Sequence, residues 1–251
     1  MFIKIIFSVK VEQIVKRIIF ALFFKDMTFI LAIQLEDSLI VASDNHFARV
    51  GKNNELQHKV GMNKLYTWDY GIVVGTDEHT VIERATQFFE LTKFNIKKLP
   101  DCLKASRLLR EMEINHEQVK ITKLMYSIFE GDDTRLYRIE PLPTGDYEVS
   151  KFQNNEIALW FFNPNLENKS MEIIKSLYEN LKNFDEFESP LDWINFYTVQ
   201  ISKLFKSQAK KDIMMSESFN IFFQKKGVTY YDYLENDGDY IPYDFIYPVN
   251  I

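Results

Sequence analysis

The sequence contains very little cysteine, because Cys102 stands alone among 251 residues. A single cysteine excludes an intrachain disulfide and a zinc site built from several cysteines. The chain therefore fits a reducing, cytoplasmic setting. Glycine and proline are also scarce, with 8 and 7 residues scattered along the chain. No low-complexity linker divides the sequence, and we expect one large domain.

Long uncharged apolar runs are missing near the start of the chain. The longest, Ile18–Phe24, has seven residues, whereas a membrane-spanning helix needs about 20. A signal peptide would add a small-residue cleavage site, which this stretch lacks. Non-specific nucleic-acid binding draws its affinity from basic side chains, and the chain as a whole carries a net charge of -6. We therefore expect neither a membrane nor a nucleic acid as partner.

The first 26 residues differ from the rest of the sequence. They carry five basic and two acidic residues, a net charge of +3. The change falls at Met27, directly before Thr28. We expect residues 1–26 to be an extension outside the domain, either sequence upstream of the true start or a propeptide or packing helix. Residues 28–251 then form a single domain.

Strand-like runs begin at Thr28. Two β-rich runs on either side of Glu36 and Asp37 predict a hairpin, and two more meet at Asp69 and Tyr70. Between these hairpins the polar stretch Asn45–Asn63 is expected to be a loop. Four further strand runs are separated by turn residues, and a last hairpin turns near Gly227. The further runs are Leu124–Phe129, Arg135–Glu140, Asp146–Phe152 and Glu156–Phe162.

Helical periodicity occurs in two pairs of segments. Asp77 and Asp101 are expected to cap the first pair, and Ser189 followed by Pro190 begins the last helix. The residues expected to face inward are Val81, Ala85, Phe88, Phe89, Leu108, Leu109, Met112, Met171, Ile174, Leu177, Tyr178, Leu181, Trp193, Tyr197, Ile201 and Leu204. Strand runs divided by helix pairs predict an α+β fold: a four-layer αββα sandwich with two stacked, mainly antiparallel sheets flanked by helix pairs.

A threonine at the start of a chain supplies both a nucleophile and a base. Its hydroxyl attacks while its own α-amine, with a pKa near ~7.7–8.0, takes the proton. A lysine ammonium nearby favours the neutral amine, and a buried carboxylate holds that lysine in place. Thr28 opens the first strand, Asp44 ends the second and Lys64 precedes the third. The N–H of Gly75, at a strand end, is placed to donate to an oxyanion.

The segments "TFILAIQLEDSLIVASDNHF" and "KLYTWDYGIVVGTDEHTVIERATQFF" resemble the proteasome-type peptidases of the N-terminal-nucleophile (Ntn) hydrolase superfamily. The bacterial proteasome-like ring peptidases are the most similar group. That family has a threonine opening strand one, an A-x-D ending strand two and a lysine before strand three. The resemblance covers roughly Thr28 to Leu234, in the second half chiefly by topology.

This resemblance implies the roles of the site residues. Thr28 is the nucleophile, Asp44 the carboxylate that supports the lysine, and Gly75 the oxyanion donor. Lys64 is the expected lysine, with Lys59 as the alternative. An Asp and a Ser also support the threonine in the family. Asp212 and Ser216 are the candidates here, although their spacing is one residue wider.

The sequence departs from the family pattern at one place, and its histidines and cysteine are expected to have structural positions only. The family has a Gly/Ser-rich turn after the eighth strand, whereas this chain reads "EIALWFFNPN". The four histidines share no metal-ligand spacing, so we expect surface positions for His46, His58, His79 and His116. Cys102 is expected to pack in a helix.

The leading hypothesis is a threonine peptidase that cuts peptides or unfolded proteins inside a homo-oligomeric ring, without metal or cofactor. An unfoldase partner is conceivable. One alternative is an Ntn amidohydrolase acting on a small amide. The other is a catalytically inactive proteasome-like structural subunit.

Overall fold

The computed structural model describes residues 28–50, 56–59, 63–130, 133–161, 166–212, 215–226, 228–238 and 241–244, with only the backbone described at 47–50, 56–59 and 130. The expected extension, residues 1–26, lies outside the described residues, as does the end of the segment that departs from the family, residues 162–165.

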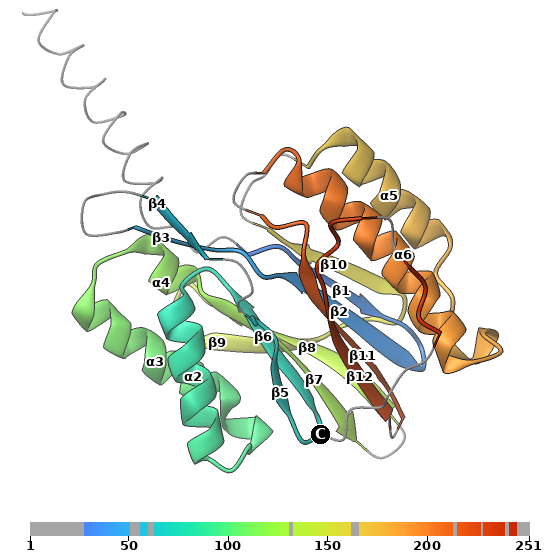
Figure 1. Cartoon of the computed structure of the whole chain (residues 1–251). Coiled ribbons are helices and arrows are strands. Elements are labelled where there is room, and N and C mark those ends of the chain that lie inside the picture. Colours follow the sequence, from blue (N-terminus) through green and yellow to red (C-terminus); the bar gives the residue numbers. More distant parts are fainter. Residues whose placement is uncertain are drawn as a thin grey trace, which may run out of the picture.

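Two five-stranded antiparallel sheets form the centre of the described structure (Figure 1). The first sheet has the strand order β10-β1-β2-β11-β12, and the second has the order β5-β6-β7-β8-β9. The strands of the first are β1 (Ile30–Gln34), β2 (Ser38–Asp44), β10 (Glu156–Trp160), β11 (Phe219–Lys225) and β12 (Val228–Leu234). Those of the second are β5 (Tyr66–Trp68), β6 (Gly71–Thr76), β7 (Lys123–Glu130), β8 (Asp133–Pro141) and β9 (Tyr147–Lys151). The α+β class with two antiparallel sheets is confirmed.

The helices gather in two groups along the chain. The first contains α2 (His79–Leu91), α3 (Leu99–Glu113) and α4 (Glu117–Ile121), and the second contains α5 (Asn168–Glu179) and α6 (Pro190–Ala209). Single 3₁₀ turns, η1 (Ile96–Lys98) and η2 (Phe184–Glu186), precede α3 and α6. In Figure 1 the first group lies beside the second sheet, and α5 and α6 lie beside the first sheet.

Three clusters of buried side chains hold these parts together. One joins α5 and α6 to β1, β2 and β11, and its largest members include Trp193 and Phe223. A second joins α2, α3 and α4 to strands β5 to β8. The third joins the two sheets, with Ile30 and Val41 from the first and Val74 and Met125 from the second. Strands β1, β2 and β6 are buried along their whole length, which explains their continuous apolar sequences.

The predicted inner face of α6 is confirmed, because Trp193, Tyr197, Ile201 and Leu204 are all fully buried. Ser189 accepts a hydrogen bond from the Asp192 N–H and so caps α6 as expected.

The predicted inner face of α3 is wrong. Leu108, Leu109 and Met112 are exposed, whereas the buried side of the helix carries Ser106 and Arg107. These two polar side chains donate to backbone carbonyls, Ser106 Oγ to Val81 at 2.8 Å and Arg107 Nη2 to Gly145 at 2.5 Å. These two hydrogen bonds make the burial tolerable, while Arg107 Nε lies 3.5 Å from Glu111 Oε1 without a hydrogen bond. In α5, Met171 and Tyr178 are likewise exposed, and Leu177 is buried.

Three local predictions also need correction. The expected loop Asn45–Asn63 contains a two-stranded hairpin, β3 (Phe47–Val50) and β4 (Leu56–Lys59). Glu78, not Asp77, caps α2, because Glu78 has the extended backbone of a cap and accepts from the Val81 N–H at 2.8 Å. Helix α3 begins at Leu99, before Asp101. Cys102 is a buried packing residue, as predicted.

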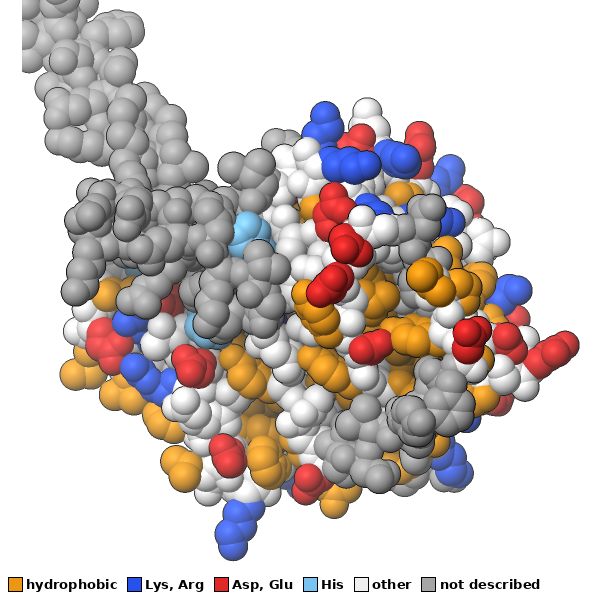
Figure 2. Space-filling model, in the orientation of Figure 1, with side chains coloured by type: hydrophobic (Ala, Val, Ile, Leu, Met, Phe, Trp, Pro, Cys, Tyr) orange, Lys and Arg blue, Asp and Glu red, His pale blue; other side chains and the backbone are white. Residues whose placement is uncertain are grey.

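Charged side chains of both signs are interspersed over the face shown in Figure 2, with hydrophobic side chains between them. No helix within the described part of the chain is long and apolar enough to cross a membrane.

Candidate active site

Thr28 lies at the start of the first sheet, two residues before β1 begins at Ile30. Its position is fixed by the next residue, because Phe29 N–H donates to Asp44 Oδ1 at 2.8 Å and Phe29 O accepts from Asp44 N–H at 3.0 Å. The Phe29 ring packs edge-on against Phe205, with ring centroids 5.1 Å apart. Thr28 itself is 7% exposed. The antiparallel register of β1 and β2 therefore brings the beginning of one strand to the end of the other.

Asp44 and Lys64 form a buried ion pair beside Thr28. Lys64 Nζ lies 2.9 Å from Asp44 Oδ1, and their side chains are 8% and 0% exposed. Burial raises the pKa of the Asp44 carboxyl. The Lys64 ammonium and the N–H groups of Phe29 and His46 act against that rise. The structure thus brings Asp44 and Lys64 together; their catalytic roles stay predictions.

A small pocket joins the threonine and lysine to the predicted oxyanion donor. Its walls are formed by Thr28, Lys64, Tyr66, Gly75, Asp77, His79 and Ile82. Four of the predicted site residues thus lie together, three of them in the pocket wall and Asp44 against Lys64. They come from different stretches of the chain, which meet where β1 and β5 begin and β2 and β6 end.

Gly75 lies between two side chains that leave no space for a larger residue. A Cβ atom at this position would come within 2.6 Å of Leu124 Cδ2 and 2.8 Å of Ile82 Cδ1. Close packing of α2 against β7 therefore accounts for the glycine. Gly75 also lies in the pocket wall, so the predicted role of its N–H as oxyanion donor can still be tested.

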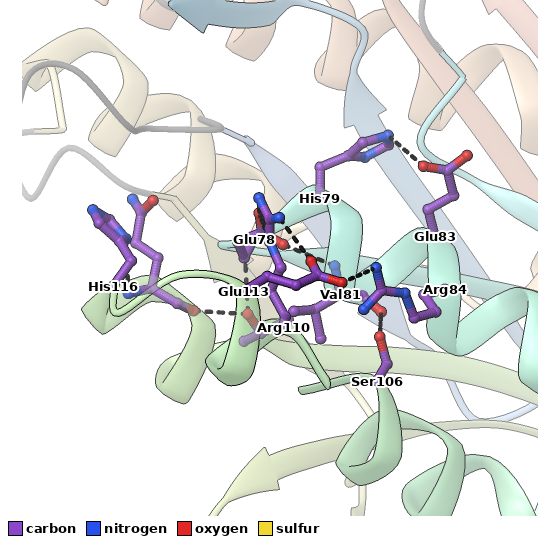
Figure 3. Close-up of polar contacts among 11 residues, drawn as sticks. Glu78, His79, Val81, Glu83, Arg84, Ser106, Arg110, Glu113 and His116 are labelled. Carbon is purple, nitrogen blue, oxygen red and sulfur yellow. Dashed lines mark hydrogen bonds and ion pairs between the residues drawn. The ribbon is translucent and has the colours of Figure 1, made fainter. Parts of the chain in front are cut away.

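The turn after Gly75 is anchored by a network of ion pairs and hydrogen bonds (Figure 3). Glu78 Oε1 accepts from Arg110 Nη2 at 2.9 Å, while its other oxygen caps α2. Arg110 and Arg84 both contact Glu113, each at 2.9 Å. The Glu78 N–H donates to Thr122 Oγ1 at 3.2 Å. This network fixes the turn between β6 and α2 through Arg110 of α3 and Thr122, which follows α4.

The other candidate residues are placed as follows. Ser216 Oγ donates to Asn45 Oδ1 at 2.9 Å and accepts from the Asn45 N–H at 3.1 Å, so it lies one residue beyond Asp44. Asp212 follows the end of α6 and accepts from the Met215 N–H through its carbonyl. Lys59 ends β4, and its side chain lies outside the described residues.

Two pocket residues were assigned other positions from the sequence. Asp77 was expected to cap a helix and His79 to be a surface residue, yet both line the pocket. Burial raises the pKa of Asp77 to about 6, with Lys123 acting against the rise. Burial also lowers the pKa of His79, which lies 3.8 Å from Glu83. The feature of the sequence that could have placed Asp77 and His79 in the pocket is their position shortly after Gly75. His46 is also buried, at 7% exposure, and the side chain of His58 lies outside the described residues.

The pocket brings together groups of the kinds that acyl transfer uses. It combines a hydroxyl group, an ammonium held by a carboxylate, and a strand-end backbone N–H. Among the described residues, no group of three or more His, Cys, Asp or Glu side chains could hold a metal ion.

No protein-family model matches the chain, and no curated protein matches it. Several solved structures share its fold. The helical assembly of the Anbu complex from Pseudomonas aeruginosa is 12% identical, with a TM-score of 0.58 over 84% of this chain and 88% of that one. An Anbu (Gly-1) mutant from Hyphomicrobium sp. strain MC1 is 11% identical, with a TM-score of 0.57 over 84% and 88%.

Anbu (ancestral beta-subunit) from Yersinia bercovieri gives a TM-score of 0.55 at 11% identity, over 83% of this chain and 88% of that one. Anbu proteins are proteasome-like relatives with an Ntn-type fold. At these identities the likeness concerns the fold alone. The chain shares the proteasome-like, Ntn-type fold of the Anbu proteins.

Proposed function

We propose that the chain is a threonine-type hydrolase of peptide bonds, active once Thr28 is its first residue. The observation that supports this most directly is the pocket in which Thr28 and Gly75 lie with Lys64, itself paired to a fully buried Asp44. A solvated strand start would not need a lysine whose ammonium is buried against a carboxylate. Burying the Lys64 ammonium costs free energy, and the ion pair with Asp44 offsets that cost. A buried lysine beside a threonine therefore indicates that its charge has a role there.

The proposed reaction is acyl transfer followed by hydrolysis. Thr28 Oγ attacks the carbonyl carbon of the peptide bond, and the Thr28 α-amine takes the hydroxyl proton. The tetrahedral oxyanion accepts a hydrogen bond from the Gly75 N–H. When the carbon–nitrogen bond breaks, the α-ammonium returns the proton to the leaving amine. A water molecule, activated by the same amine, then hydrolyses the ester and restores Thr28.

Lys64 acts on this reaction through charge. Its ammonium favours the neutral form of the α-amine, which is the form that can accept a proton. Asp44 holds Lys64 in position and is itself held by the N–H groups of Phe29 and His46. Ser216, attached to Asn45, is the candidate for further support of the Thr28 end. Asp212 remains the second candidate.

A covalent label that needs both groups of an N-terminal threonine tests the proposal. A peptide epoxyketone forms a six-membered ring with a hydroxyl and an adjacent free α-amine. The chain begun at Met27, from which methionine removal leaves Thr28 first, should gain one inhibitor mass on Thr28. The same chain with Thr28→Ala should gain none, and the full-length chain should gain none until it is trimmed.

Trimming itself is measured by the intact mass of the protein made in its native host. A mass that starts at Thr28 supports the proposal. Failure of a correctly trimmed chain to be labelled, or unchanged peptidase activity in the Thr28→Ala variant, would overturn it in favour of a structural subunit.

The proposal extends to the architecture and assembly. The three core clusters support a four-layer αββα sandwich, with helices against the outer face of each sheet. The Anbu complex from P. aeruginosa forms a helical assembly, which supports homo-oligomers of this chain, in a ring or an open helix. A cytoplasmic setting follows from the near absence of cysteine. Size-exclusion chromatography with light scattering measures the assembly directly.

A further inference from the structure

Asp77 is the unusual residue of the pocket. It lines the same pocket as Thr28, and its backbone has φ +86°. That value lies in the left-handed region, which residues other than glycine adopt at a cost. Both neighbouring positions are fixed, since Thr76 pairs with Lys123 in the sheet and Glu78 is held by Arg110. The turn is therefore held in this conformation from both sides.

The Asp77 carboxylate is half-buried and accepts no hydrogen bond from any residue that the structure describes. Burying a carboxylate without a donor costs free energy. Asparagine or glycine at this position would avoid that cost and tolerate the backbone at least as well. An unpaired carboxylate in a strained turn, beside the proposed nucleophile, indicates a ligand that pairs with it.

The charges around the pocket favour a cation. Lys64 is the only lysine or arginine in the pocket wall as described, and Asp44 neutralises it. The titratable groups around Asp77 are Lys64 and His79 in the same pocket wall, the Lys123 ammonium, and the phenol of Tyr147, whose pKa is raised to about 12 and which is therefore neutral. Burial lowers the pKa of His79, and Lys123 lies over the Trp160 ring and 3.8 Å from Glu140. The carboxylate of Asp77 thus leaves the pocket with a net negative charge.

A second hollow, about 360 Å³ in volume, adjoins the pocket and shares Tyr66 with it. Its charged wall residues are Glu83 and Glu90, and its aromatic ones include Trp68 and Phe94. A chain segment that crossed this hollow toward Asp77 would therefore meet the carboxylates of Glu83 and Glu90, together with aromatic rings that attract cations.

We infer that the site is built for peptides with a basic side chain next to the bond that is cut, and that Asp77 binds the cation. Lysine fits best, because its ammonium is a compact point charge and the pocket beside Thr28 is small. The aliphatic stem then lies over Tyr66. This inference rests on the proposed function, and it makes Asp77 the residue that determines specificity.

Equilibrium binding tests the inference without requiring turnover. Two fluorescent peptides differ at one residue, lysine against the uncharged norleucine, and bind the Thr28→Ala protein. Both the full-length chain and the chain begun at Met27 are measured. The ratio of the two peptide affinities is taken from the form that binds the peptides more tightly. The lysine peptide should bind at least about tenfold more tightly, as expected for one hydrogen bond to a charged group. Adding Asp77→Asn should reduce this ratio to about one.

Two controls separate recognition from folding and from overall charge. Asp77→Gly, which suits φ +86°, should lose the preference as Asp77→Asn does, and neither should melt at a lower temperature than the parent. Asp101→Asn, an exposed position on α3, removes the same charge and should keep the preference. Equal binding of the two peptides, or a preference that survives Asp77→Asn, overturns the inference. Failure of the epoxyketone label would instead overturn the proposed function.

Discussion

Replacing Lys64 by methionine should destabilise the protein more than any exposed charge change. Lys64 is 7% exposed and Asp44 is fully buried, so the substitution leaves a carboxylate in the interior without its ammonium. The aliphatic part of the side chain is kept, because methionine has a similar length. The experiment therefore measures the charge and not a cavity.

The expected magnitude follows from the geometry. At 2.9 Å the attraction between unit charges is about 6 kcal/mol with an effective dielectric constant of about 20. Removing one partner of a buried pair typically costs about 3–5 kcal/mol. Asp44 keeps the N–H groups of Phe29 and His46 as donors, so the loss should lie near the lower end, about 3 kcal/mol.

Urea denaturation of four proteins measures this value: the parent, Lys64→Met, Asp44→Asn and the double variant. The double-mutant cycle should give a coupling free energy of at least about 2 kcal/mol. Lys98 and Asp101 provide the matched control, because they pair at 3.3 Å with side chains 57% and 71% exposed. Their cycle should give no more than about 0.5 kcal/mol. Additive effects at Lys64 and Asp44 would refute the buried ion pair.

Three further predictions test other parts of the structure. Because the pKa of Asp77 is raised from 3.8 to about 6, its charge costs stability above pH 6 and nothing below about pH 4. Asp77→Asn should therefore stabilise the protein by about 1–3 kcal/mol more at pH 8 than at pH 4, and a pH-independent difference in urea denaturation would contradict this. Gly71→Ala should cost about 1–3 kcal/mol, since its Cβ would lie 2.4 Å from a β7 carbonyl oxygen, whereas Gly238→Ala, with nothing within 4 Å, should melt like the parent. Tyr197→Phe should cost about 1–2 kcal/mol, because the Tyr197 hydroxyl bonds both the N–H and the carbonyl of Lys182; an unchanged melting temperature would contradict that role.

Local sequence was sufficient for the strands of the core. The runs that contain β1, β2 and β6 are apolar on both sides, and these strands are buried along both faces. The meeting of Asp44 with Lys64 could be predicted because both lie at strand ends, and strand ends are placed by the register of the whole sheet. The long stretch Asn45–Asn63 did not affect this prediction, because its length does not alter where β5 begins.

Interactions between distant segments could not be predicted in the same way. The buried face of α3 contains Ser106 and Arg107 because the carbonyls of Val81 and Gly145 happen to lie within reach. Hydrophobic periodicity therefore selected the wrong face, with Leu108 and Leu109. The β3–β4 hairpin was missed because its polar sequence has no alternating apolar pattern. Its pairing is carried by the backbone.

The pocket residues show the same limit at the candidate site. Asp77 could not be recognised from its sequence as a pocket residue, because a left-handed φ depends on how both flanking segments are held. A sequence pattern predicts a helix cap there, and Glu78 takes that role instead. The helix cap therefore lies one residue beyond the position that the local pattern selects.

The position of Thr28 is determined by residues that follow it in the chain. Phe29 bonds to Asp44 through both its N–H and its carbonyl, and its ring packs against Phe205. Removal of everything before Thr28 would leave these contacts unchanged and add one α-amine at the edge of the pocket. If translation begins at Met27, routine methionine removal leaves Thr28 first, because threonine is small, and no self-cleavage is needed. Trimming at Met27 would then convert an ordinary strand start into a nucleophile that carries its own base, with Lys64 already in place.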